Sequence, residues 1–468
     1  MKELKELEDL KELEDLKELE NLKELEDLKE LKELKHLKRL SSVKSGTGIK
    51  FLTPAVSPGS HCPMRIASVI VKDIQGLSSL LVGTQECATH SRLFNPHPEG
   101  RQGELHWLYT LSDQEVVFGC REGVRDALKK MDQAGARAIL LIATCIPELI
   151  GEDMEGIIQE IQPELSARVT YVMLGQFKNV SHPPGSWKTM KALGLLMEKK
   201  ATDPRRINVL GRAPEEDHIP EPSLLPELVR QSIALRYLAP GASLEDLQNA
   251  GDAALNLVVS PYTQPLAVQM QEELGIPYVS LHHRYAVKDI DQAYEDIAQR
   301  FGLSWGDAFA EERRRALALE NQAQQRLGGL RFVCAPRVDL PIPLSVYLTD
   351  LGMEPLLLHL EEYYPEDKDH ARELITRGHD PLICRMVNEE AELPILQKLN
   401  PDLCIGYMSY TDIRIPCVAN MMDYYGQVGY ERTRGLLTRI LGVAAKVDTK
   451  ENKGNKEQGG MAYGTASV

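Results

Sequence analysis

The sequence predicts an α/β protein of three Rossmann-like domains with doubly wound parallel sheets, preceded by an N-terminal low-complexity helical extension. Short apolar runs alternate with segments of helical periodicity from residue 61 to residue 446. Such alternation is typical of parallel sheets covered by helices. Hydrophobic residues make up 43% and charged residues 26% of the 468 residues, so the chain can form large buried cores.

Residues 1–40 form a low-complexity tract in which leucine recurs at every third position, separated by Lys, Glu and Asp. This composition favours a helix. A period of three carries the leucines around the helix axis, so they form no continuous coiled-coil seam. We therefore expect a solvated helix without a catalytic part, with weak self-association as the alternative. Residues 41–60 are rich in Ser, Gly and Pro and are predicted to be a linker.

The body of the chain divides where turn-forming residues interrupt the periodicity, at 202–206 and 327–329. The predicted α/β domains span 61–204, 205–325 and 326–446. Apolar runs expected to form buried strands are 138–143, 169–174, 207–210, 255–259, 278–281, 332–334, 356–358, 382–384 and 403–405. Helical spacing lies between them, as in Ile290, Tyr294, Ile297 and Phe301. Residues 447–468 are rich in Lys, Asn, Gly and Gln and are predicted to be a disordered tail.

Charge and motifs exclude several classes of function. Acidic residues outnumber basic ones 69 to 54, so we expect no nucleic-acid partner. The longest apolar run, 138–150, is shorter than the roughly 20 residues that cross a bilayer, and residues 1–40 do not resemble a secretory signal. We expect a cytoplasmic protein without a membrane partner. The sequence contains no P-loop, no G-x-G-x-x-G after a strand and no G-x-S-x-G elbow.

The eight cysteines contain no C-x-x-C pair, and a reducing cytoplasm does not favour a disulfide framework. Those in short apolar runs are expected to be core thiols: Cys334, Cys384, Cys404 and Cys417.

Cys145 is the most informative cysteine, because it directly follows the predicted strand 138–143. Pro147 suits a first helical turn, so the thiol is expected at a helix N-terminus, in the crevice where doubly wound sheets bind ligands. Cys62 and Cys87 lie in predicted loops. Shared metal ligation and incidental core or loop thiols both remain open. A structural zinc site, completed by His61 or His90, is a third reading.

Three segments carry a resemblance to a known family: GTQECATHSR at 83–92, EVVFGCREGVRDAL at 115–128 and ATCIPELIGED at 143–153. Further matching segments follow in the same order at 255–260, 273–278, 400–406 and 423–430. Over residues 61–446 the chain resembles the nitrogenase component 1 family. That family includes molybdenum–iron protein subunits, cofactor-scaffold relatives and the catalytic subunits of dark-operative protochlorophyllide reductase and related tetrapyrrole reductases.

The resemblance implies that Cys62, Cys87 and Cys145 bind the iron of an iron–sulfur cluster, either 4Fe-4S or P-cluster-like. Because three cysteines leave a cubane cluster one ligand short, it also implies a homo-oligomer or a homologous component 1 partner chain. Residues expected to support the site and its packing are Ser91, Arg92, Gly151, Glu152 and Asp153.

Two departures from the family pattern limit what the resemblance implies. The dinitrogen-reducing catalytic subunit has a cysteine where this chain has Ser260, and a histidine near 426–430 where this chain has none. Reduction of dinitrogen by this chain alone is therefore not implied. Cys120 stands where the family usually has glycine. It is either an extra ligand or a core thiol, and the core reading is simpler.

The leading implied function is a reductase component. It would accept electrons from an ATP-dependent, nitrogenase reductase-like iron protein and reduce a small-molecule or tetrapyrrole substrate. This chain contains no nucleotide-binding motif, which is expected if ATP is bound and hydrolysed by the iron protein and not by this chain. The alternative is a non-catalytic scaffold on which a metal cofactor is assembled.

Overall fold

A computed structural model describes residues 37–46, 49, 62–100, 102–177, 183–211, 219–238, 241–336, 338, 340–385, 392–406, 415–424 and 426–458. The chain forms two compact units. One comprises residues 58–328 and 420–445, and the other comprises residues 1–57, 329–419 and 446–468. Residues 1–36 of the helix predicted over residues 1–40 lie outside the described residues.

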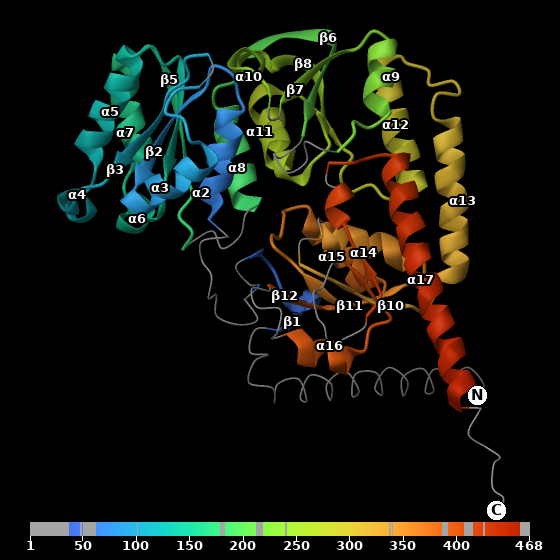
Figure 1. The fold of residues 1–468 in the computed structure, drawn as a ribbon. Coiled ribbons are helices and arrows are strands. Elements are labelled where there is room, and N and C mark those ends of the chain that lie inside the picture. The colour runs from blue at the N-terminus through green and yellow to red at the C-terminus, as the bar shows by residue number, and fades with distance from the viewer. Residues whose placement is uncertain are drawn as a thin grey trace, which may run out of the picture. The chain divides into compact units, whose positions relative to one another are not determined.

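The first unit contains two parallel sheets, of which the first has the strand order β3-β2-β4-β5. Its strands are β2 (Ser78–Gly83), β3 (His106–Thr110), β4 (Ala138–Ala143) and β5 (Arg168–Met173), all mutually parallel. Its helices are α2 (Pro63–Lys72), α3 (Gln85–Phe94), α4 (Asp113–Phe118), α5 (Arg121–Gln133), α6 (Cys145–Ile150), α7 (Met154–Ile161) and α8 (Pro183–Gly194), with the short 3₁₀ turn η5 (Gln162–Glu164) (Figure 1). Every residue of β2 and β4 is buried, as expected for central strands covered on both faces.

The second sheet has the order β7-β6-β8-β9 and is also parallel throughout. Its strands are β6 (Lys199–Leu210), β7 (Ala234–Leu238), β8 (Gly251–Val258) and β9 (Tyr278–Ser280). Its helical elements are α9 (Leu224–Arg230), α10 (Leu244–Asn249), η7 (Pro261–Thr263), α11 (Gln264–Leu274), α12 (Val287–Phe301) and α13 (Ala310–Arg326). The spacing predicted from Ile290 to Phe301 is confirmed by α12, which buries all four of those side chains.

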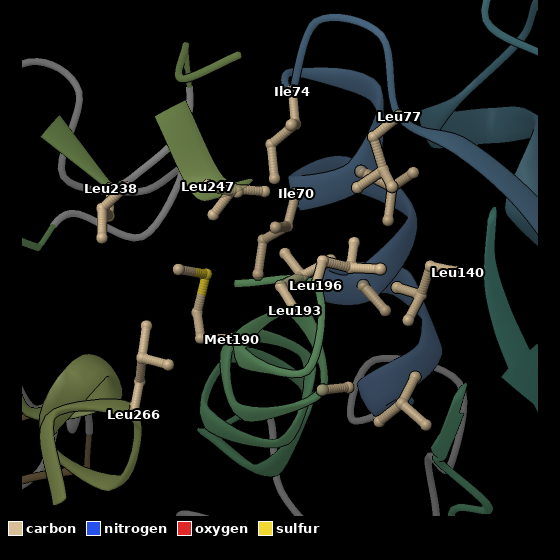
Figure 2. Close-up of a cluster of buried hydrophobic side chains, with 14 of the residues drawn as sticks. Ile70, Ile74, Leu77, Leu140, Met190, Leu193, Leu196, Leu238, Leu247 and Leu266 are labelled. Atoms are coloured by element: carbon tan, nitrogen blue, oxygen red, sulfur yellow. The ribbon is translucent and has the colours of Figure 1, made fainter. Parts of the chain in front are cut away.

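One hydrophobic core joins the two sheets of this unit. Ile70 and Ile74 of the α2 region and Leu193 of α8 face Leu247 of α10 and Leu266 of α11 (Figure 2). Each of these side chains is at most 2% exposed. Burying a side chain of this size contributes about 1.5–3 kcal/mol, so the core fixes α2 firmly against the unit.

The second unit contains the third sheet, in the order β1-β12-β11-β10-β13-β14. Its strands are β1 (Lys38–Arg39), β10 (Arg331–Cys334), β11 (Glu354–His359), β12 (Leu382–Cys384), β13 (Leu403–Ile405) and β14 (Cys417–Val418). All pairings are parallel except that of β1 with β12. The helices are α14 (Pro341–Asp350), α15 (Asp367–Thr376) and α16 (Leu393–Leu399). The three sheets, parallel apart from the pairing of β1 with β12, and the helices that accompany them confirm the predicted α/β fold class.

The end of the leucine-rich tract differs from the prediction. Residues 38 and 39 form β1, and η2 (Leu40–Ser42) follows it. Leu40 is 1% exposed, and its N–H donates to the Pro381 carbonyl (3.0 Å). The edge of β12 offers unpaired backbone groups and an apolar site, and these long-range contacts outweigh the local helical preference.

Two predicted boundaries fall inside regular elements. The boundary at 204/205 lies within β6, where the register against β8 shifts on both sides of Asp203. Pro204 is tolerated at such an irregularity. The tail predicted from residue 447 begins within α17 (Tyr430–Gln458), which follows the 3₁₀ turn η9 (Met421–Tyr424). Extending a helix costs less than starting one, so α17 continues past its apolar part.

Candidate metal centre

The first sheet reverses its winding between β2 and β4, with β3 on one side and β5 on the other. Doubly wound sheets bind ligands at the carboxyl ends of strands beside such a switch point. The register pairs Val82 of β2 with Ala143 of β4, so both strands end at the same edge. Cys87 and Cys145 follow these two strands, on α3 and α6 (Figure 1).

All three predicted ligands lie at helix N-termini rather than in irregular loops. Cys62 is the N-cap of α2, Cys87 is the third residue of α3, and Cys145 is the first residue of α6. Thr84 sets the start of α3, because its side chain accepts a hydrogen bond from the Cys87 N–H (3.5 Å). The positive end of a helix stabilises a thiolate.

A close approach of the backbone at Gly83 brings the segments of Cys87 and Cys145 together. A Cβ atom placed on Gly83 would lie 2.2 Å from Thr144 Oγ1 and 3.1 Å from Cys87 Cβ. Thr144 immediately precedes Cys145 and donates a hydrogen bond to the Val82 carbonyl (3.0 Å). Only glycine fits between these groups, so Gly83 permits the approach.

The sulfur atoms receive hydrogen bonds from neighbouring groups. The Gln176 N–H, which follows β5, donates to Cys145 Sγ (3.3 Å). The Thr84 hydroxyl donates to Cys87 Sγ (3.7 Å). Such donors stabilise the thiolate, which is the form that binds metal.

The pKa values of the thiols respond to burial and to one another. Burial raises the pKa of Cys62 to about 11. The Met64 N–H opposes this rise, and Cys145 and Cys87 add to it. Burial also raises the pKa of Cys145, the Gln176 N–H lowers it, and Cys87 raises it. Metal bound here must displace protons, so binding will strengthen as pH rises.

The spacing of the sulfur atoms separates two kinds of metal site. Among the described residues, Cys62, Cys87 and Cys145 do not form a group whose ligand atoms all lie within 4.8 Å of one another. A single zinc ion with bonds of about 2.3 Å holds its thiolates roughly 3.8 Å apart. The three sulfur atoms are therefore not arranged around a single zinc ion in this structure, and thiolates are also the donors that iron–sulfur clusters use. His61 lies outside the described residues, and His90 packs edge-to-face on Phe94 at 5.2 Å.

Cys120 belongs to a different environment. It is 1% exposed and packs in a core with Val124 of α5 and Met154 of α7. Its N–H donates to Glu152 Oε2 (2.5 Å). Burial raises the pKa of its thiol to about 12, and the charge that adds most to this rise is Glu152. The packing therefore favours the interpretation of Cys120 as a core thiol over that of an extra metal ligand.

The residues expected to support the site hold the helices in place. Ser91 of α3 hydrogen-bonds Ser68 of α2 (3.2 Å) and so ties the helix of Cys87 to that of Cys62. Arg92 donates to the carbonyls of Asn95, His97 and His106 and joins the end of α3 to β3. Gly151 ends α6 with a φ of 75°, and Asp153 caps α7 by accepting from the Gly156 N–H (2.9 Å).

Ser260 and the four remaining cysteines lie in or beside strands of the second and third sheets. Ser260 is fully buried after β8 and precedes η7, at the switch point of the second sheet. Cys334, Cys384 and Cys404 are buried in strands of the third sheet, whereas Cys417 is partly exposed on β14.

Exposed apolar side chains lie on α6, which carries Cys145, and on elements next to it. α4 lies against α6, and together with the segment after β5 these elements carry them. We define the apolar patch as Val117, Phe118, Leu149, Ile150 and Phe177, which are 40% to 86% exposed. Exposed large hydrophobic side chains in such numbers mark an interaction surface. Sequence reasoning missed this patch, although the run Val116-Val117-Phe118 ahead of Gly119 was a visible signal.

The fold and the site together define a class: α/β domains that present cysteine thiols beside the switch point of a parallel sheet. This chain belongs to the family of nitrogenase component 1 type oxidoreductases, because the model of that family matches residues 62–444. Proteins of this family bind iron–sulfur clusters and work with an iron-protein reductase.

Individual relatives agree with this assignment. The chain is 25% identical over 410 residues to the nitrogenase iron-molybdenum cofactor biosynthesis protein NifE of Rippkaea orientalis, covering 81% of this chain and 84% of that protein. It is 21% identical over 422 residues to the nitrogenase molybdenum-iron protein beta chain of Methanococcus maripaludis, covering 81% and 90%. The solved structure of nitrogenase Cp1 at pH 6.5 has the same fold, with a TM-score of 0.63 at 20% identity over 84% and 94% of the two chains.

Within the described part of the chain, no helix is both long and apolar enough to span a membrane.

Proposed function

We propose that this chain is an iron–sulfur subunit of the nitrogenase component 1 type, with a 4Fe-4S or P-cluster-like cluster held by Cys62, Cys87 and Cys145. The observation that supports the proposal is that three thiols lie at three helix N-termini, two of which follow the strands at the switch point, and that Cys87 and Cys145 both act electrostatically on Cys62. Thiolates are the usual ligands of such clusters. The bound cluster would supply one-electron transfer, and the protein would hold its ligands and limit the access of water.

A second chain is expected to complete the site. Three thiols leave a cubane cluster one ligand short, and the apolar patch lies on the elements around them. We propose a second copy of this chain or a homologous component 1 subunit as the partner that covers it, in the cytoplasm. Aromatic and aliphatic side chains at the centre of an interface carry most of its binding energy.

Within this class we favour an assembly scaffold, on which a metal cofactor is built and then passed on. The likeness to NifE, a cofactor biosynthesis protein, over 84% of its length supports this choice. Ser260 is a buried serine at the second switch point, where dinitrogen-reducing relatives have a cysteine, so it argues against reduction of dinitrogen but not against reduction of other substrates.

A reductase is the second candidate, supported by the oxidoreductase description of the family. In that role the chain would accept electrons from an ATP-dependent, nitrogenase reductase-like iron protein and reduce a small-molecule or tetrapyrrole substrate. The two roles differ in what the iron protein does. A reductase oxidises it continuously when ATP and the right substrate are present, whereas a scaffold shows no such turnover and instead retains added iron–sulfur cofactor precursor.

Iron content tests the proposed ligands. Protein purified without oxygen is expected to be brown, with about four iron atoms per cluster, and Cys87→Ala or Cys145→Ala should remove the colour. Cys120→Ala is the matched control, since Cys120 also precedes a helix yet packs in a separate core. Colourless wild-type protein with stoichiometric zinc, or loss of iron only in Cys120→Ala, would refute the assignment.

A further inference from the structure

The third sheet carries a thiol, an imidazole and a carboxylate in a row at its carboxyl edge. His359 ends β11, Cys384 ends β12, and the register pairs them directly. His359 Nδ1 lies 3.4 Å from Cys384 Sγ, and His359 Nε2 hydrogen-bonds Glu392 Oε1 ahead of α16. None of the three residues is more than 3% exposed.

This arrangement has the geometry of an activated nucleophile. A thiol, a base within hydrogen-bond reach and a third group that orients the base form the recurrent pattern of reactive cysteines. Burial opposes a positive charge on His359, but Cys384 and Glu392 outweigh it and raise the pKa of His359 well above its ordinary value. An imidazolium beside a sulfur atom stabilises the thiolate.

Two other thiols of the same sheet provide a comparison. Cys334 on β10 and Cys404 on β13 are 0% exposed, as is Cys384. Burial raises the pKa of Cys334 to about 12 and, with Cys417, raises that of Cys404 well above its ordinary value. In the described part of the chain, the polar contacts of these two thiols are with Ser345, Cys417 and backbone carbonyls, and not with an imidazole. The charge of Glu392 also acts on Cys404, so at equal burial the imidazole of His359 beside Cys384 is the main chemical difference.

We propose that Cys384 is a peroxide-reactive thiol activated by His359 and Glu392. Its burial selects the oxidant, because only a molecule as small as hydrogen peroxide can enter through small local openings. The Cys384 thiolate attacks one peroxide oxygen, and the O–O bond breaks. His359 gives its proton to the departing hydroxide, which leaves as water. Sulfur loses two electrons, peroxide gains two, and the product is Cys384 sulfenic acid.

The test follows each cysteine of the full-length protein by peptide mass spectrometry after brief exposure to limiting hydrogen peroxide. A metal chelator is present, so that iron released from any cluster does not generate radicals. Cys384 is expected to oxidise roughly ten-fold faster than Cys334 and Cys404 in the same molecules. Cumene hydroperoxide, which is bulkier, should oxidise Cys384 more slowly than hydrogen peroxide does.

Variants separate activation from packing. Glu392→Gln keeps the shape of the side chain but removes its charge, so it should slow Cys384 oxidation towards the rate of Cys334. His359→Gln should do the same. Equal rates for Cys384, Cys334 and Cys404 in the wild type would overturn the proposal, and that comparison needs no variant to fold. If the folded Glu392→Gln variant oxidises Cys384 as fast as the wild type, the activation of Cys384 through Glu392 and His359 would be overturned.

Discussion

Gly83 is the residue on which the geometry of the cysteine site depends most. A methyl group at this position would meet Thr144 Oγ1 at 2.2 Å, and Thr144 is a short, buried side chain held by the Val82 carbonyl. We expect Gly83→Ala to push α3 from α6, to lower the free energy of unfolding by about 1–3 kcal/mol and to reduce bound iron. Chemical denaturation and iron analysis measure both effects.

Gly442→Ala on α17 is the control for that substitution, because an added Cβ there meets no atom within 4 Å. It should stabilise the helix by up to about 1 kcal/mol and leave iron content unchanged. Full iron binding in Gly83→Ala would show that the close approach is not needed for the site.

His106 makes stability depend on pH. Burial lowers its pKa to about 4, although Glu104 opposes the effect, and its Nδ1 hydrogen-bonds Ser79 Oγ (3.0 Å). The unfolded chain binds a proton at this residue below about pH 6.5, whereas the folded chain does so only near pH 4. The free energy of unfolding should therefore fall as pH drops from 6.5 to 4, by up to about 3 kcal/mol from this group. His106→Gln should flatten that part of the profile, and an identical slope in both proteins would contradict the assignment.

At the scale of elements, β1 anchors the end of the leucine-rich tract. Leu40 is 1% exposed, and Asp380 accepts hydrogen bonds from the Ser41 N–H (2.8 Å) and hydroxyl (2.6 Å). Leu40→Ala should lower the free energy of unfolding by about 2–4 kcal/mol. Lys44→Ala, an exposed neighbour, should change it by less than about 0.5 kcal/mol. If Leu40→Ala leaves the free energy of unfolding unchanged, the original prediction that the whole tract is solvated would stand.

The sequence predicted the elements whose pattern is local. β4 and β12 match their apolar runs from end to end, because central strands are apolar on both faces. β3 and β7 were not predicted, since these edge strands mix buried and exposed residues. β1 consists of two charged residues and is a strand only because it pairs with β12, which lies about 340 residues further along the chain.

The candidate site could be predicted only in part. The family resemblance implies Cys62, Cys87 and Cys145 as ligands, and their role in binding metal stays a prediction. The separation of Cys120 into another core depends on the packing of α5 against α7, which no local pattern encodes. The hydrogen bond from the Gln176 N–H to Cys145 Sγ joins residues 31 apart in the chain, so it also could not be predicted from a local sequence pattern.

At the scale of the whole molecule, the apolar patch predicts association. Phe118 is 86% exposed, and Phe118→Glu would place a charge at the surface proposed to meet a partner chain. Light scattering should show oligomeric wild-type protein and a shift towards monomer in Phe118→Glu, with loss of iron if the partner completes the site. Leu195→Glu, which alters an exposed leucine just beyond α8 (50% exposed) and outside the apolar patch, should leave the mass unchanged. A monomeric wild type with its cluster intact would contradict this account.

Anomalous diffraction from crystals grown without oxygen will show whether Cys62, Cys87 and Cys145 together bind one iron–sulfur cluster, as we claim. Data collected on either side of the iron absorption edge locate iron regardless of any assumed chemistry. We expect iron atoms within bonding distance of all three sulfur atoms, with each sulfur on a different iron. Anomalous signal at the zinc edge from a single ion, or iron bound elsewhere while these three thiols stay free, would contradict the claim.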